Sequence, residues 1–120
     1  MARIMTIDDS VSMRKLVAAT LAAAGHEVVE ASNGSEGLSL AKQGLVQLFI
    51  SDINMPVMDG LAFVKSLRTI AAYKFTPVLM LTTEMDPDKK KVAKEAGATG
   101  WLVKPFDPDQ LLATIRKVLD

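Results

Sequence analysis

Residues 48–52 read LFISD, a short run suited to a buried strand with an aspartate at its end. Such continuous apolar runs, without polar alternation, are typical of parallel strands covered on both faces. Four other short segments of similar character are spread along the chain. We therefore expect five strands, at Arg3–Ile7, Glu27–Ala31, Leu48–Ser51, Val78–Thr82 and Thr99–Val103.

The longer segments between these strands carry the spacing of helices. The first has apolar residues at helical intervals that we expect to face a sheet: Met13, Leu16, Val17, Thr20, Leu21 and Ala24. The last begins with Asp107-Pro108, since aspartate can cap a helix and proline is tolerated at its first position. We expect the last helix to bury Leu111, Leu112, Ile115, Val118 and Leu119.

The middle helices give weaker signals. A second helix is expected from about Ser35 to Gln43, and its Gly37 costs about 1 kcal/mol relative to alanine. The fourth helix has the thin apolar face Val92, Ala93 and Ala96, so we expect it to be the least firmly held.

Strand and helix alternate five times, which predicts an α/β fold with a doubly wound parallel sheet. We expect one domain over residues 1–120, with strand order 2-1-3-4-5 and the flavodoxin-like (βα)5 architecture. The periodicity alone does not select this order. The polar residues at the strand ends favour it, because ligands bind there at the switch point of such sheets.

Composition excludes several classes of function. The 14 basic and 14 acidic residues give no net charge, which argues against a nucleic-acid binder. Cysteine is absent, so a disulfide framework or a cysteine nucleophile is excluded. The apolar stretch at the N-terminus is too short for a signal peptide, and no stretch approaches the length of a membrane span, so we expect a soluble, cytoplasmic monomer.

Polar residues follow four of the predicted strands: Asp8-Asp9, Asp52, Thr82 and Lys104. Parallel strands end at one edge of the sheet, so these groups are expected to meet there. Carboxylates brought together repel one another, and a divalent cation relieves the repulsion. Oxygen ligands without histidine or cysteine suit Mg²⁺, which also shares its ligand shell with phosphate oxygens.

The same cluster suits phosphoryl transfer. An aspartate carboxylate is an accepted nucleophile for phosphoryl groups, and Asp52 lies on the middle strand. Lys104 is suited to contact a phosphoryl oxygen as a point charge, and the Thr82 hydroxyl to donate to one. Asp8 and Asp9 are expected to hold the ion. As an alternative, Asp8-Asp9 before Ser10 could simply cap a helix.

Five segments resemble the response-regulator receiver domain, in order and at matching spacing. They are Ile7-Asp8-Asp9-Ser10 with Met13-Arg14, Ser51 to Gly60, Leu81-Thr82-Thr83-Glu84, Ala96-Gly97-Ala98 and Val103-Lys104-Pro105-Phe106. The resemblance covers the whole chain. It implies a signalling receiver that catalyses its own phosphorylation and dephosphorylation, rather than an enzyme.

The resemblance also implies individual roles. Asp52 is then the phosphoacceptor, Thr82 the switch hydroxyl and Lys104 the contact to the phosphoryl group. Mg²⁺ is held by Asp9, Asp52 and the backbone carbonyl of Asn54, with Asp8 helping through water. The Lys104–Pro105 bond is expected to be cis.

Within the family, Asn54 and Glu84 resemble the single-domain chemotaxis branch, where these positions flank the phosphoryl group. The implied partners are a CheA-like histidine kinase, a flagellar motor switch protein or another effector, and a phosphatase. The switch position on the fifth strand is commonly Tyr in the family, whereas here it is Trp101. Trp101 is either a switch residue or ordinary edge-strand packing. Lys89-Lys90-Lys91 is either a solvated face or part of the docking surface of helix 4, strand 5 and helix 5.

Two other functions remain open. One is a relay intermediate or adaptor within the same family. The other is a phosphohydrolase of the haloacid dehalogenase type, which needs an acidic residue two positions after its nucleophile. That position is Asn54, which cannot protonate a leaving group. We expect Asp59-Gly60 to be a turn and His26 to be a surface residue.

Overall fold

The computed structural model describes residues 1–83 and 87–120. It contains a five-stranded parallel sheet of order β2-β1-β3-β4-β5, with every neighbouring pair parallel. The strands are β1 (Arg3–Ile7), β2 (Glu27–Ala31), β3 (Leu48–Asp52), β4 (Val78–Thr82) and β5 (Gly100–Val103). The expected fold class and strand order are confirmed.

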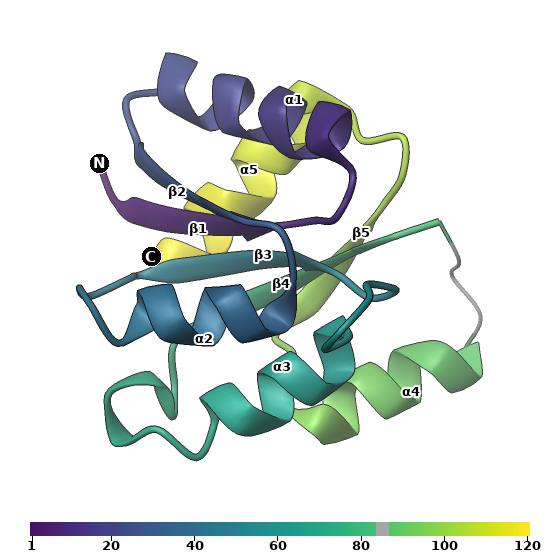
Figure 1. Cartoon of the computed structure of the whole chain (residues 1–120). Helices are drawn as coiled ribbons and strands as arrows, with labels where there is room; N and C mark the ends of the chain where they lie inside the picture. Colours follow the sequence, from purple (N-terminus) through teal and green to yellow (C-terminus); the bar gives the residue numbers. More distant parts are fainter. Residues whose placement is uncertain (84–86) are drawn as a thin grey trace.

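Helices cover both faces of the sheet, as Figure 1 shows. One face carries α1 (Val11–Ala23) and α5 (Pro108–Leu119). The other carries α2 (Gly34–Ala41), α3 (Gly60–Leu67) and α4 (Pro87–Ala96), and a short 3-10 turn, η1 (Ala71–Tyr73), precedes β4. No helix among the described residues is long and apolar enough to span a membrane.

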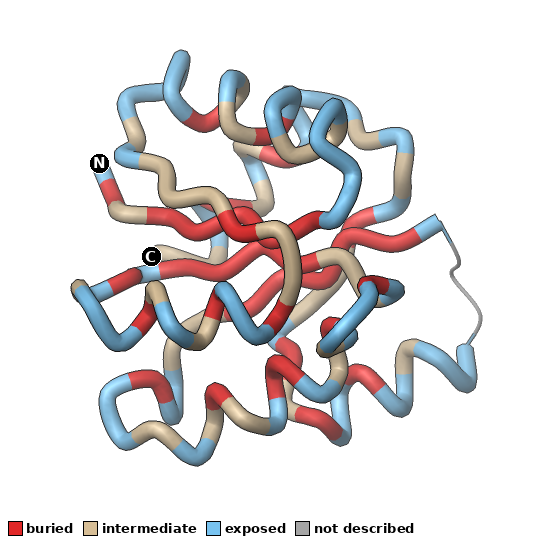
Figure 2. The backbone as a smooth tube through the Cα atoms, in the orientation of Figure 1, coloured by how far each residue is buried: buried red, intermediate tan, exposed pale blue. Residues whose placement is uncertain are grey.

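The sheet separates two hydrophobic cores because successive strand residues point to opposite faces. Met5, Phe49 and Met80 pack with α2, α3 and α4, while Ile4, Ile50 and Leu79 pack with α1 and α5. The central strands β3 and β4 are buried almost throughout, as Figure 2 shows in red. The edge strand β2 has the sequence EVVEA, with two glutamates, and it is mostly half-buried, as expected for a strand that is not fully covered.

The expected helix faces are confirmed for α5 and wrong in part for α1. Leu111 and Ile115 of α5 are fully buried. In α1 only Val17 and Leu21 are buried, whereas Leu16 is 54% exposed. Ala24 is also exposed and forms the C-cap of the helix. A narrow buried stripe is enough to pack α1 against the sheet, because α1 shares this face of the sheet with α5 (Figure 1).

The packing of α4 and α2 differs in detail from what the sequence predicts. In α4, Ala93 and Ala96 are buried but Val92 is 46% exposed, so the buried face is thinner still. Gly37 in α2 has a packing reason, since a Cβ there would lie 3.0 Å from Ile7 Cδ1 and 3.2 Å from Phe63 Cε1. The helix thus lies close against β1 and α3 where a larger residue would intrude.

Candidate phosphoryl-acceptor and metal site

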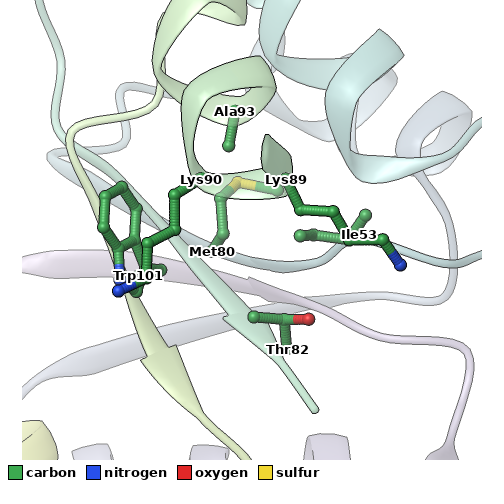
Figure 3. A pocket seen from close by; sticks show the side chains of 7 residues that line it. All are labelled: Ile53, Met80, Thr82, Lys89, Lys90, Ala93 and Trp101. Carbon is green, nitrogen blue, oxygen red and sulfur yellow. The ribbon is translucent and has the colours of Figure 1, made fainter. Parts of the chain in front are cut away.

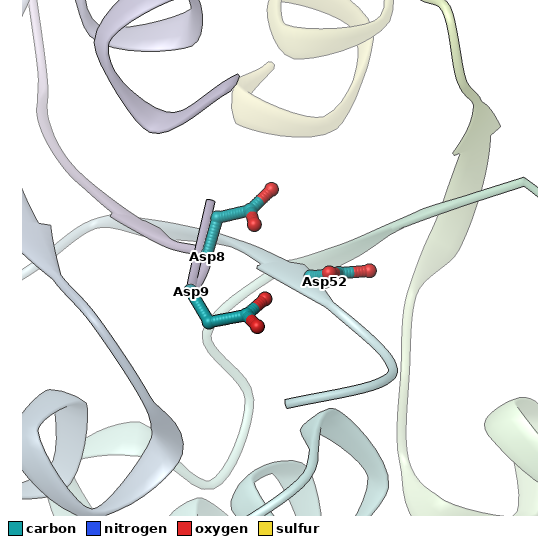
Figure 4. A group of neighbouring side chains, drawn as sticks. All are labelled: Asp8, Asp9 and Asp52. Atoms are coloured by element: carbon teal, nitrogen blue, oxygen red, sulfur yellow. The ribbon is translucent and has the colours of Figure 1, made fainter. Parts of the chain in front are cut away.

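Three carboxylates meet at the carboxyl ends of β1 and β3. One oxygen each from Asp8, Asp9 and Asp52 lies within 4.8 Å of the others, and Figure 4 shows the three side chains as neighbours. The strand register explains this, because Ile7 pairs with Ser51 and the next residues on both strands are aspartates. Asp8 is buried, Asp52 half-buried and Asp9 exposed.

Lys104 joins this acidic cluster from the end of β5. Its Nζ lies 3.2 Å from Asp8 Oδ2 and 3.3 Å from Asp52 Oδ2. The side chains of Lys104 and Asp52 are 14% and 13% exposed, so the contacts are largely shielded from solvent. The Lys104–Pro105 peptide bond is cis, as expected.

The charges in this cluster are not balanced. Burial raises the pKa of Asp52 above its usual value; Lys104 opposes the rise, and the neighbouring Asp8 carboxylate adds to it. One lysine cannot compensate three carboxylates. The site therefore has a physical preference for an additional cation.

The oxygen atoms present suit a hard divalent ion. Mg²⁺ takes oxygen ligands at about 2.1 Å in octahedral geometry, so ligands on opposite sides of the ion are about 4.2 Å apart. The 4.8 Å span of the three carboxylates is compatible with sharing one such ion, directly or through water. The cluster thus fits the expected metal site on spacing and on ligand chemistry.

Thr82 ends β4 beside this cluster. It is 6% exposed, and its backbone carbonyl accepts a hydrogen bond from the Lys104 backbone N–H at 2.8 Å. Thr82 pairs with Val103 in the β4–β5 register, which places Lys104 one residue beyond the paired strands. The structure therefore brings Thr82 and Lys104 to the same edge as Asp52.

The loop after β3 is held tightly to the end of that strand. The Ile53 N–H donates to Asp52 Oδ1 at 2.8 Å, and the Gly60 N–H donates to the Ile53 carbonyl at 2.7 Å. A Cβ at position 60 would lie 2.1 Å from the Asp52 carbonyl oxygen, so only glycine fits this approach. The sequence predicts a turn at Asp59-Gly60, but the structure gives these residues a further role at the start of α3. The Asp59 carboxylate caps this helix by accepting a hydrogen bond from the Ala62 N–H at 2.8 Å.

Asn54 is exposed in this loop. It borders a cavity of about 200 Å³ between the loop and α4, together with Ile53, Asp59, Leu61, Lys89 and Val92. Glu84, the other position expected to flank the phosphoryl group, lies outside the described residues.

Trp101 lies half-buried on β5, with Lys90 Nζ 5.2 Å from its ring centroid. Figure 3 shows the indole beside Lys90, with Thr82 further along the cavity wall. The cavity between them has about 10 Å³, close to the space that one water needs. The indole thus packs against the core, while an α4 lysine lies over its ring.

The alternative that Asp8 and Asp9 cap α1 is wrong, because the cap is Ser10, whose Oγ accepts from the Met13 N–H at 3.3 Å. His26 is half-buried, and its Nδ1 accepts from the Ala2 N–H at 3.1 Å.

Sequence reasoning missed two support residues of the cluster. Arg14 Nη1 donates to the Asp8 carbonyl at 2.7 Å, and Arg14 Nε donates to Glu30 Oε1 at 3.2 Å. Arg14 drew attention only as part of a motif, and Glu30 resembled an ordinary polar residue near a strand end. The only sequence signal for the pair was a basic residue in the first turns after Asp8-Asp9.

A sequence model of the response regulator receiver domain matches residues 4–116, so the chain belongs to the response regulator receiver domain family. Within that family it is of the CheY type. It is 38% identical over 119 residues to a chemotaxis protein CheY homolog of Campylobacter jejuni, covering 98% of this chain and 92% of that protein.

Two further relatives extend the comparison. Protein PilH of Pseudomonas aeruginosa is 37% identical over 119 residues, covering 99% of this chain and 98% of that protein. The solved structure of the Vibrio cholerae chemotaxis protein CheY4 is 52% identical, covers 98% of both chains and has a TM-score of 0.96. The similarity therefore includes both the sequence and the whole arrangement of helices and strands.

Proposed function

We propose that this chain is a single receiver domain that accepts a phosphoryl group on Asp52. The observation that carries the proposal is the contact of one Lys104 ammonium with both Asp8 and Asp52, the two less exposed members of a cluster of three carboxylates. This arrangement supplies a nucleophile, a cation aimed at it and oxygen ligands for a metal. It has more negative charge than a purely structural ion pair requires.

The chemical step is an in-line displacement. A carboxylate oxygen of Asp52 attacks the phosphorus of a phosphohistidine, an O–P bond forms and the N–P bond breaks. The imidazole nitrogen retains the electron pair of the broken bond. Such transfers depend mainly on positioning and charge neutralisation. The Lys104 ammonium lies 3.3 Å from Asp52 Oδ2, so it can contact the phosphoryl oxygens once the group is attached to Asp52.

Asp9, Asp52 and the Asn54 carbonyl would hold Mg²⁺, with Asp8 reaching it through water. When bound, the ion neutralises negative charge on the carboxylates and on the phosphoryl oxygens. Asp8 also accepts from Lys104, so it keeps the lysine next to the acceptor.

Phosphorylation would then shift a population between two states of the chain. Thr82 would donate to a phosphoryl oxygen, and it lines the small cavity that Trp101 also lines. Because Thr82, Lys90 and Trp101 line the same cavity, new contacts at Thr82 would also change the packing of Trp101 and Lys90. The output surface would be α4, β5 and α5.

The chemotaxis names of the CheY relatives favour a matching role here. The phosphodonor would be a CheA-like histidine kinase, and the effector a flagellar motor switch protein, with a phosphatase ending the signal. A pull-down with beryllofluoride-activated protein tests the output. Recovery of a motor component supports this role, whereas recovery of a histidine phosphotransfer protein assigns the chain to a relay.

Intact-mass spectrometry tests the proposed chemistry. Incubation with acetyl phosphate and Mg²⁺ is expected to add the mass of one phosphoryl group, and chelation of the metal to abolish the gain. The Asp52→Asn variant is the matched control, with nearly the same shape but no nucleophile. An equal gain in Asp52→Asn, or no gain in the original protein, rejects Asp52 as the acceptor.

A further inference from the structure

We propose that Arg14 and Glu30 are positioning residues of the metal site, which fix the peptide that joins Asp8 to Asp9. The inference rests on the proposed binding of Mg²⁺ at the acidic cluster. It concerns Arg14 on α1, which contacts the backbone carbonyl of Asp8, and Glu30 on β2, which contacts Arg14.

The contacts form a short chain from β2 to the site. Glu30 accepts from Arg14 Nε at 3.2 Å, and Arg14 Nη1 donates to the Asp8 carbonyl oxygen at 2.7 Å. The Arg14 side chain is 14% exposed and that of Glu30 is 28% exposed. Lys15 Nζ also lies 3.0 Å from Glu30 Oε2, but no contact joins it to Asp8 in the described part of the chain.

The carbonyl that Arg14 holds belongs to the Asp8–Asp9 peptide. Because a peptide is planar, fixing its oxygen also fixes the direction of the Asp9 N–H and limits the placement of both carboxylates. The other polar groups of Asp8 are engaged as well. Its N–H donates to the Ala31 carbonyl at 3.1 Å, Oδ1 accepts from the Ser10 N–H at 2.9 Å and Oδ2 accepts from Lys104.

Asp9 is exposed to solvent, whereas Asp8 is buried. The Asp9 carboxylate therefore depends on its own backbone for placement. Groups that orient metal ligands from behind typically change metal affinity about 10- to 100-fold when removed. Arg14 is such a group, and Glu30 holds its guanidinium in the required orientation.

Electrostatics alone predicts the opposite effect. A positive charge near a cation site repels the ion, so removing Arg14 without a positional effect should tighten Mg²⁺ binding. Lys15 provides the matched control because Lys15→Met also removes one positive charge beside Glu30. Positioning and charge therefore predict opposite signs for Arg14→Met.

Calorimetric titration with MgCl₂ at neutral pH tests the proposal on the original chain, Arg14→Met and Lys15→Met. Arg14→Met is expected to weaken Mg²⁺ binding about 10-fold, and Lys15→Met to leave it unchanged or slightly tighter. Amide hydrogen exchange of metal-free protein supplies a second readout, with faster exchange at Asp9 and Ser10 in Arg14→Met only. Mg²⁺ binding by Arg14→Met within about twofold of the original chain, or tighter, overturns the proposal.

Arg14→Lys covers the case in which Arg14→Met does not fold. Lysine keeps the charge but lacks the planar fork that reaches the Asp8 carbonyl and Glu30 together. It is expected to weaken Mg²⁺ binding as well, and undiminished binding in this variant also rejects the positioning role. If the original chain itself binds no Mg²⁺, the proposed function fails rather than this inference alone.

Discussion

Lys104 contacts the carboxylates of Asp8 and Asp52 but carries only one positive charge, so the negative charge of this pair is not fully compensated. Asp52 is half-buried, and burial together with Asp8 raises its pKa despite the lysine. A group arranged in this way serves reactivity at a cost in stability, a common trade-off at functional sites.

Removing the Asp52 charge should therefore stabilise the metal-free protein. Asp52→Asn is expected to raise the free energy of unfolding at pH 7 by about 0.5–2 kcal/mol. A folded pKa above the unfolded pKa means that stability falls as pH rises between the two values. The advantage of the variant should thus shrink as the pH falls through the raised pKa of Asp52. Thermal unfolding of both proteins in chelator, from acidic to neutral pH, measures this stability difference. If Asp52→Asn is less stable than the original protein at pH 7, the Asp52 charge does not destabilise the metal-free fold.

Removing Lys104 should have the opposite effect. Lys104→Met leaves Asp8 and Asp52 without their shared cation, and we expect a loss of about 3 kcal/mol in metal-free buffer. Mg²⁺ should restore part of this loss because it supplies the missing positive charge. Denaturant unfolding with and without MgCl₂ checks both effects. Equal losses in the two buffers would show that Lys104 and the ion do not serve the same carboxylates.

Much of the site could be predicted because its groups follow directly from strand ends. The sequence places Asp8, Asp52, Thr82 and Lys104 just at or beyond four parallel strands, and the sheet brings them together. The Arg14–Glu30 support could not be predicted in this way. Its contact to a backbone carbonyl depends on side-chain reach between α1 and β2, which no periodicity encodes.

At the element scale, close approaches connect the helices to the site. Gly60 begins α3 directly against the Asp52 carbonyl, and Gly37 lies in α2 against Ile7 and Phe63. The neighbours differ in how easily they move. Position 60 faces rigid backbone, whereas position 37 faces the ends of side chains.

The two glycines form a matched pair for mutation. Gly60→Ala is expected to cost about 1–3 kcal/mol or more, since its Cβ forces β3 and α3 apart. Gly37→Ala should be close to neutral, because about 1 kcal/mol of gained helix propensity offsets the crowding. Chemical denaturation of both variants measures the difference. A Gly37→Ala protein that is less stable than Gly60→Ala would contradict this packing argument.

The elements themselves were predicted well, and the deviations have physical causes. Strand bounds follow from apolar runs, so they agree within one residue at β3 and β5. The exposure of Leu16 could not be foreseen, since helical spacing defines a stripe but not its width. That width depends on the neighbouring helix α5.

At the scale of the whole molecule, Thr82 lies at the same sheet edge as the acidic cluster and lines a cavity that Trp101 also lines. Trp101 is the only tryptophan, so its fluorescence reports this region alone. Mg²⁺ together with beryllofluoride is expected to change its emission through Thr82 and the adjoining cavity, with no change in Asp52→Asn. An identical response in that variant would place the signal outside the proposed route.

A crystal structure grown with Mg²⁺ and beryllofluoride tests the central claim most directly. The account predicts one ion between Asp9 and Asp52, with the beryllofluoride on an Asp52 oxygen and Lys104 contacting a fluoride. An ion bound elsewhere, or beryllofluoride on another residue while Asp52 stays paired with Lys104, would contradict it.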